Sequence, residues 1–334
     1  MVIDLASVWA IILAFAVLAY VVMDGFDLGI GILFPLLERT THRDTAMNSV
    51  APVWDGNETW LVLGGGGLMA AFPLAYAVLL PALYAPITIM LLALIFRGVA
   101  FEFRWREPRH KPVWSLSFFS GSVIAALAQG IALGAIVQGI AVDGRAYGGG
   151  WWDWLTPFSL MTGVALVVGY ALLGSTWLIM KTTGELKATA TRFAWISGIG
   201  TVGLIGVVSL WTPFLYPAFW ERWFNWPATA FSVWVPLLVA ACVALLAQGL
   251  RRGDDTQPFL ASLGLFLLSY IGLAISLYPN IIPPDVSIWR AAAPDDSLSF
   301  LLVGAVILIP LILGYTAYSY WVFRGKMDPD EGYH

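Results

Sequence analysis

Long apolar runs, separated by short polar connections, repeat along the whole chain. An α-helix needs about 20 mostly apolar residues to cross the hydrocarbon core of a bilayer. The runs predict nine membrane-spanning helices, at about 7–37, 52–72, 76–100, 116–140, 157–180, 193–213, 228–250, 259–278 and 298–323. Pro73 marks the turn between the second and third spans, because proline fits the start of a helix but interrupts its interior. The pattern predicts an all-α polytopic membrane protein forming a single transmembrane domain over residues 1–334.

The composition agrees with this class and excludes two kinds of cysteine chemistry. Hydrophobic residues make up 59% of the chain and charged residues 11%, whereas soluble domains carry about 25% charged residues. The only cysteine, Cys242, excludes an intrachain disulfide and an iron–sulfur cluster held by this chain's own cysteines. Nothing in the sequence suggests a nucleic-acid partner.

Basic side chains gather in every second connection, while the other connections hold few of them and most of the loop tryptophans. Cytoplasmic connections of membrane proteins are enriched in Lys and Arg. We therefore expect the N-terminus on the periplasmic side and the C-terminus in the cytoplasm. The basic residues on which this rests are Arg39, Arg43, Arg97, Arg104, Arg106, Arg109, Lys111, Lys181, Lys187, Arg192, Arg251, Arg252, Arg324 and Lys326.

Two pairs of carboxylates interrupt the first two apolar runs. Asp24 and Asp27 are three residues apart, which places them on one face of the first helix, and Asp55 and Glu58 repeat that spacing at the start of the second. In the expected orientation, both pairs lie toward the cytoplasmic side at about the same depth. A charged side chain in hydrocarbon costs about 2.5–3.5 kcal/mol on insertion scales, so these four residues are candidates for a function.

Proton uptake is the chemistry that such a cluster favours. Arg97 and Glu102, at the cytoplasmic end of the third span, can join the four acids. Carboxylates crowded together in a low dielectric cannot all be ionised, so at least one is expected to take up and release protons. The alternative interpretation is that the acids only pair with Arg97 or cap the ends of helices.

Histidine is missing from every predicted span. The three histidines, His42, His110 and His334, fall in connections or in the C-terminal tail. Haem in proteins is commonly held by axial His or Met ligands, and no His, Cys and carboxylate spacing typical of a metal site is visible. The chain alone is therefore expected to bind neither haem nor metal, and we assign it no catalytic residue of its own.

Five segments resemble a known family. They are VMDGFDLGIG at 22–31, NSVAPVWDGNETWL at 48–61, FRGVAFEFR at 96–104, YPNIIPP at 278–284 and YTAYSYWVFRGK at 315–326. The chain resembles subunit II of the cytochrome bd-type ubiquinol oxidases along its whole length. Its short length and its ending are most similar to the branch called cyanide-insensitive oxidases.

The resemblance implies an enzyme complex of the bacterial cytoplasmic (inner) membrane that oxidises ubiquinol or menaquinol and reduces dioxygen to water. The larger subunit I would carry two b-type haems and one d-type haem, or a third b-type haem, together with the quinol-oxidation site. This chain would be the smaller subunit, packed against subunit I within the lipid bilayer. A small single-helix subunit is a further candidate partner.

The resemblance also implies roles for single residues. Asp24 and Asp55 would be acids of a cytoplasmic proton path, flanked by Asp27 and Glu58. Contacts with subunit I would be shaped by Trp54, Asn57 and Trp60. The chain departs from the family in having Glu58 where Gln is frequent, and Trp289-Arg290 where Trp-Asp is common.

Two alternatives stay open at this point. A proton-coupled transporter would use the carboxylates as coupling sites near the middle of the membrane, but no inverted repeat is visible. A pure scaffold subunit would have its acids locked in salt bridges with Arg97 and Arg104.

Overall fold

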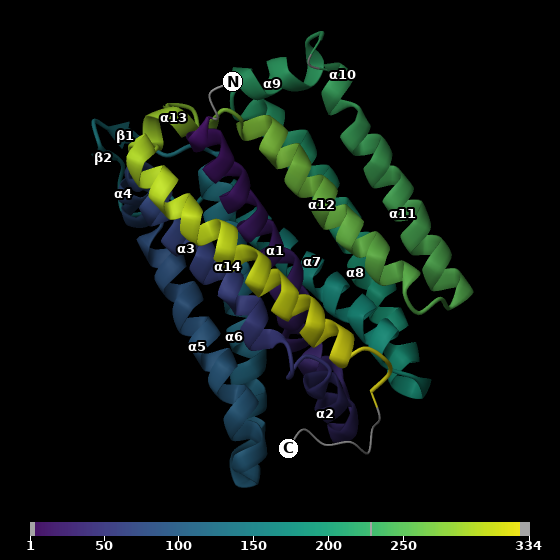
Figure 1. Cartoon of the computed structure of the whole chain (residues 1–334). Helices are drawn as coiled ribbons and strands as arrows, with labels where there is room; N and C mark the ends of the chain where they lie inside the picture. Colours follow the sequence, from purple (N-terminus) through teal and green to yellow (C-terminus); the bar gives the residue numbers. More distant parts are fainter. Residues whose placement is uncertain (1–3, 228, 328–334) are drawn as a thin grey trace.

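The computed structural model describes residues 4–227 and 229–327, and shows a bundle of long helices with two small hairpins at one end (Figure 1). Residues 1–3 and 328–334 of the predicted domain, and residue 228 at the start of the predicted seventh span, lie outside this part. The elements are α1 (Leu5–Leu33), α2 (Thr40–Asn48), α3 (Trp54–Ala71), α4 (Pro73–Ala82), α5 (Tyr84–Arg106), α6 (Lys111–Val137), β1 (Val142–Asp143), β2 (Ala146–Tyr147), α7 (Pro157–Lys181), α8 (Gly184–Trp211), α9 (Pro217–Phe224), α10 (Thr229–Ser232), α11 (Trp234–Arg252), α12 (Gln257–Leu277), β3 (Asn280–Ile282), β4 (Val286–Ser287), α13 (Ile288–Ala291) and α14 (Asp295–Val322).

Eight helices of the described chain are long and apolar enough to cross a membrane: α1, α5, α6, α7, α8, α11, α12 and α14. This confirms the predicted class, an all-α polytopic membrane protein. A further helix, α3, occupies the position of the predicted second span. It has 18 residues, and at about 1.5 Å per residue it is long enough to run beside α1 through most of the hydrocarbon core. Asp55, Asn57 and Glu58 make its first turns polar, and it is not among the eight apolar helices of the described chain.

The predicted third span differs from the structure because the helix breaks at Leu83. A short helix, α4, begins at Pro73, where the sequence pattern places a turn, and α5 then continues to Arg106 instead of ending near 100. Pro81 lies inside α4 and Pro86 in the first turn of α5. Each proline lacks the N–H that would continue the helical hydrogen bonds, which favours a break between them.

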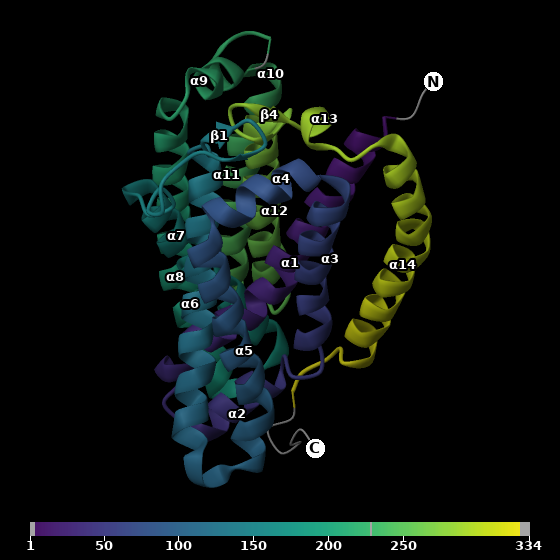
Figure 2. The ribbon, with the colours of Figure 1, turned by 90° about the vertical axis from the view of Figure 1, so that its left-hand side faces the viewer.

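The connections separate into two groups at opposite ends of the bundle (Figures 1 and 2). The lower end holds the segment containing α2, the α5–α6, α7–α8 and α11–α12 junctions, and the end of α14. The β-hairpins, α4, α9, α10 and α13 lie at the upper end. The lower end is the one that carries the basic connections recognised in the sequence. The alternation of basic and tryptophan-rich connections is therefore also a spatial separation.

Helix α1 is the centre of the bundle and packs against α3, α6 and α7. Its closest approach is to α7, where the backbones of Gly29 and Gly174 touch. A Cβ atom at Gly29 would lie 1.9 Å from the Tyr170 carbonyl oxygen, and one at Gly174 would lie 2.4 Å from the Gly29 carbonyl carbon. One turn away, the Phe26 ring stacks on Trp177 with ring centroids 4.2 Å apart. Small residues thus let two spanning helices meet closely.

Helix α14 runs along the outside of the bundle beside α1 and α3 (Figure 2). Leu298 is its only buried residue in the described chain, and its backbone oxygen accepts a 3.0 Å hydrogen bond from Trp9 Nε1. At the other end, Lys326 donates to the carbonyl oxygens of Ile179 and Thr182 and pairs with Asp255. Hydrogen bonds from Lys187 and Lys326 lower the pKa of Asp255. Polar contacts thus hold α14 mainly near its ends.

Candidate functional site

One arginine and three carboxylates form a buried cluster between α1, α3 and α5. Arg97 Nη1 lies 2.7 Å from Asp24 Oδ1 and 2.8 Å from Glu58 Oε1, and Arg97 Nη2 lies 3.8 Å from Asp27 Oδ2. The side chains of Arg97, Asp24 and Asp27 are at most 1% exposed, whereas that of Glu58 is 25% exposed. Glu58 is therefore the member of the cluster closest to the surroundings of the chain.

Aromatic rings fix the guanidinium of Arg97 in place. It lies 5.9 Å from the centroid of the Trp54 ring and 5.8 Å from that of Phe101. The two rings stack on each other at 4.7 Å with an interplanar angle of 4°. Cation–π contacts of this kind are worth more when the cation has lost its water, as here. Trp54 therefore supports the cluster from within this chain.

A first polar branch leads from the cluster to α14. Asn57 Nδ2 donates a 2.7 Å hydrogen bond to Asp27 Oδ2, and the Tyr320 hydroxyl donates a 2.9 Å bond to Asn57 Oδ1. The Asn57 side chain thus points into the chain's own interior. Residues from α1, α3 and α14 meet in this branch although 263 positions separate Asn57 from Tyr320.

A second polar branch starts one helical turn before Asp24. Gln129 Nε2 donates a 2.7 Å hydrogen bond to the Tyr20 hydroxyl, and the Tyr170 hydroxyl donates a 2.9 Å bond to Gln129 Oε1. Tyr20 and Asp24 share a face of α1 because they are four residues apart. This branch brings polar groups of α6 and α7 toward the acids.

Asp55 and Glu102 do not join the cluster, contrary to the sequence-based expectation. Asp55 lies on the outer, exposed face of α3. Two residues correspond to about 200° around a helix, so Asp55 points away when Asn57 points inward. Glu102 is half exposed and pairs with Arg106 at 3.0 Å. Five residues after Arg97, it is rotated by about 140° to another face of α5.

Two other residues considered in the sequence, Trp60 and Arg104, also lie outside the contacts of the cluster. Trp60 is 1% exposed and meets Phe15 edge-on, with ring centroids 5.6 Å apart. Arg104, which the scaffold alternative pairs with the membrane acids, contacts Asp44 at 2.6 Å instead. The sequence reasoning missed Tyr320, Tyr20 and Tyr170 as neighbours of the site. A lone Gln129 in an apolar run was the available signal for one of the two branches.

The cluster contains more acids than bases. If Asp24, Asp27 and Glu58 were all ionised, Arg97 would balance only one of three charges. Buried charges that lack a partner are strongly unfavourable. Binding a proton relieves this excess without moving a helix, so the arrangement is suited to taking up and releasing protons.

In the part of the chain that the structure describes, the residues do not fit a metal ion, and no long helix carries a histidine that could hold a haem. No group of His, Cys, Asp and Glu with the geometry of a metal site occurs in the described part of the chain. His42 lies in the short helix α2, and His110 lies 3.4 Å from Glu107 between α5 and α6, outside the long helices. His334 lies outside the described residues.

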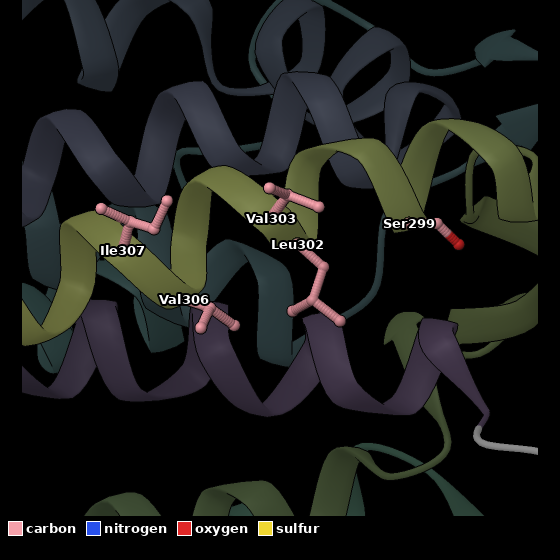
Figure 3. A pocket seen from close by; sticks show the side chains of 5 residues that line it. All are labelled: Ser299, Leu302, Val303, Val306 and Ile307. Atoms are coloured by element: carbon pink, nitrogen blue, oxygen red, sulfur yellow. The ribbon is translucent and has the colours of Figure 1, made fainter.

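Hollows in the described part of the chain lie away from the acid cluster. One is an open groove of about 480 Å³ along α14, lined by Ser299 and the four aliphatic residues Leu302, Val303, Val306 and Ile307 (Figure 3). The other is a small hollow of about 40 Å³ at the upper end of the bundle, between Leu83, Ile140 and Trp154. Neither lining includes a member of the cluster.

The fold and the site together define a polytopic helical membrane protein with a buried acid–arginine cluster. Residues 5–323 match the family described as cytochrome bd terminal oxidase subunit II, and the chain belongs to that family. It is thus a subunit of a bd-type quinol oxidase, which is a quinol:oxygen oxidoreductase complex, and a multi-pass protein of the bacterial cytoplasmic membrane. Membership of a cytochrome family implies haem in the complex, and a second subunit implies a subunit I partner.

Similar proteins cover nearly the whole chain. The cytochrome bd-I ubiquinol oxidase subunit 2 of Escherichia coli K12 is 28% identical, covering 98% of this chain and 96% of its relative. The cytochrome bd ubiquinol oxidase subunit 2 of Bacillus subtilis is 30% identical and covers 98% of both chains. A chain of the bd oxidase from Geobacillus thermodenitrificans superimposes with a TM-score of 0.79 over 96% of this chain and 99% of that chain, at 15% identity, which supports the fold.

Proposed function

We propose that this chain delivers protons from the cytoplasm toward the oxygen-reducing site of subunit I, and that it stabilises that larger subunit. Reduction of dioxygen to water consumes protons as well as electrons. The observation that carries the proposal is the excess of buried acids around Arg97, with Glu58 partly open to the surroundings. In this proposal, Glu58 receives protons and Asp24 and Asp27 hold them within the membrane.

Asp55 lies outside the cluster and faces the partner in this proposal. It lies on the outer face of α3, three residues before Glu58. The same face carries Gly66, eleven residues later and rotated by only about 20°, at which an added Cβ would meet nothing within 4 Å. Small residues on an open helix face let another spanning helix approach closely. We assign this face to contact with subunit I, while the side chains of Asn57 and Trp60 act inside this chain.

The cofactors and the substrate belong to the partner in this proposal. Following the family resemblance, we place two b-type haems and a d-type haem, or a third b-type haem, on subunit I; the lack of histidine in the long helices of this chain agrees with that placement. Ubiquinol or menaquinol is oxidised there, in keeping with the ubiquinol oxidase names of the relatives. In the proposed orientation, the basic end of the bundle faces the cytoplasm and the N-terminus lies on the periplasmic side. A small single-helix subunit is a further proposed partner.

Asp24→Asn is expected to lower quinol-driven oxygen uptake, measured per haem of the purified complex, by about tenfold or more, equivalent to about 1.4 kcal/mol in the barrier of the limiting step. The amide keeps the shape of the side chain but cannot release a proton. Glu102→Gln is the matched control, since this acid is half exposed and paired outside the cluster. Unchanged turnover of Asp24→Asn, with both complexes showing the wild-type haem spectrum, would contradict the proton path.

The scaffold function is the second candidate, and the close contacts of Arg97 with Asp24 and Glu58 favour it. It predicts a lower yield of assembled Asp24→Asn complex with normal turnover per haem.

A tagged purification in mild detergent tests the partner directly. A larger co-eluting subunit with b- and d-type haem bands supports the assignment, whereas a colourless chain after crosslinking in native membranes contradicts it.

A further inference from the structure

Tyr320 makes a polar contact between α14 and the acid cluster that the proposed proton path does not yet use. This tyrosine lies two residues before the end of α14. Its ring packs edge-on against Phe26 and Trp177, with centroids 6.4 and 6.2 Å away. Its hydroxyl donates to Asn57 Oδ1 at 2.9 Å. The aromatic contacts hold the hydroxyl in a defined place, so the bond to Asn57 is directional.

The bond from Tyr320 has a consequence for the orientation of the Asn57 amide. An asparagine side chain presents an acceptor oxygen on one side and a donor nitrogen on the other. With Tyr320 donating to the oxygen, the nitrogen faces Asp27 Oδ2 at 2.7 Å and the Met23 carbonyl oxygen at 3.4 Å. The Met23 oxygen can only accept a hydrogen bond, which supports the same orientation independently.

The orientation of the amide matters for the proton on Asp27. A donor nitrogen suits a carboxylate anion, whereas an oxygen in its place would suit only a protonated carboxyl. The charged and titratable groups that face Asp27 are Asp24 from α1, Glu58 from α3, Arg97 from α5 and Tyr320 from α14. Asn57 of α3 contacts both Asp27 of α1 and Tyr320 of α14, so the orientation of its amide decides whether Asp27 meets a donor or an acceptor.

We propose that Tyr320 is a positioning residue for proton uptake, which holds Asn57 with its amide nitrogen toward Asp27. The inference rests on the proposed proton path and extends it to α14. An outer helix, joined to the bundle mainly near its ends, then influences the cluster through one hydroxyl group. Loss of that hydroxyl leaves the Asn57 amide free to turn its oxygen toward Asp27.

Tyr320→Phe tests this inference, since it keeps the packing of the ring and removes only the hydroxyl. We expect oxygen uptake of the holoenzyme to fall about three- to tenfold, as for the loss of one hydrogen bond, and its pH profile to be displaced toward higher pH. Tyr318→Phe is the matched control, because this side chain lies two residues away on α14 and is 62% exposed. Both variants are measured with the haem spectrum and the melting temperature.

A double-mutant cycle separates positioning from a purely structural role. If Tyr320 acts through Asn57, Tyr320→Phe has little further effect on the pH profile in an Asn57→Ala background. A lowered melting temperature with the wild-type pH profile would overturn the inference, and so would additive effects in the cycle. A slowed Asp24→Asn complex beside a normal Tyr320→Phe complex defeats only this inference, whereas normal turnover of both defeats the proton path itself.

Discussion

Replacement of Arg97 by methionine is expected to lower the free energy of unfolding by about 3–5 kcal/mol, the usual cost of removing one partner of a buried ion pair. The arginine is fully buried and lies between acids on two other helices. Without it, Asp24 and Asp27 must be protonated, or remain as charges without a counterion. The readouts are the yield of assembled complex and its melting temperature in detergent.

Two further variants sharpen this test. Arg106→Met is the control, because Arg106 is 79% exposed and pairs with Glu102 at the surface. Exposed pairs contribute about 0–1 kcal/mol, so little change is expected. Arg97→Lys keeps the charge but has a single ammonium group to serve carboxylates on α1 and α3, and we expect an intermediate loss. A complex of Arg97→Met as stable as wild type would show that the acids do not need this cation.

Gly29→Val is expected to prevent assembly of a stable complex, and Gly29→Ala to weaken it. A Cβ at this position would lie 1.9 Å from the Tyr170 carbonyl oxygen and 2.7 Å from the Gly174 backbone nitrogen. Both neighbours are backbone atoms, so only a separation of α1 from α7 makes room. Overpacking of a core costs about 1–3 kcal/mol, and more where the surroundings cannot move.

The matched control for this prediction is Gly203→Val. Gly203 lies in the C-terminal half of α8, and an added Cβ would meet nothing within 4 Å. The same substitution there changes the local helix propensity but creates no collision. The yields of assembled complex and the melting temperatures are compared for the two variants. Similar behaviour of Gly29→Val and Gly203→Val would mean that the contact between Gly29 and Gly174 is not important for stability.

The sequence carried enough information for the class of fold and for most of the acid cluster. Apolar runs of about 20 residues are typical of membrane-spanning helices, so these runs predicted the positions of the long helices. The spacing of Asp24 and Asp27 fixed a shared face of α1, because helical geometry alone determines it. Arg97 was a candidate for the cluster because it lies at the expected depth.

The errors arose where the rotation of a helix or a break in it decides the outcome. Asp55 and Glu102 lie close in the sequence to Glu58 and Arg97 but on other faces of α3 and α5, and no local pattern gives that rotation. The break at Leu83 depends on two prolines acting within a run that stays apolar throughout. Tyr320 could not be placed, because its contact with Asn57 exists only once α14 has packed beside α3.

The most direct test of the proton path is time-resolved proton uptake by the fully reduced complex when it reacts with dioxygen, in vesicles with a pH indicator on one side. The wild-type complex is expected to take up protons from the side of the basic connections, and Asp24→Asn to slow that uptake while the initial reaction of dioxygen with haem keeps its rate. Equal rates of proton uptake in the two complexes, or uptake from the opposite side, would contradict the account.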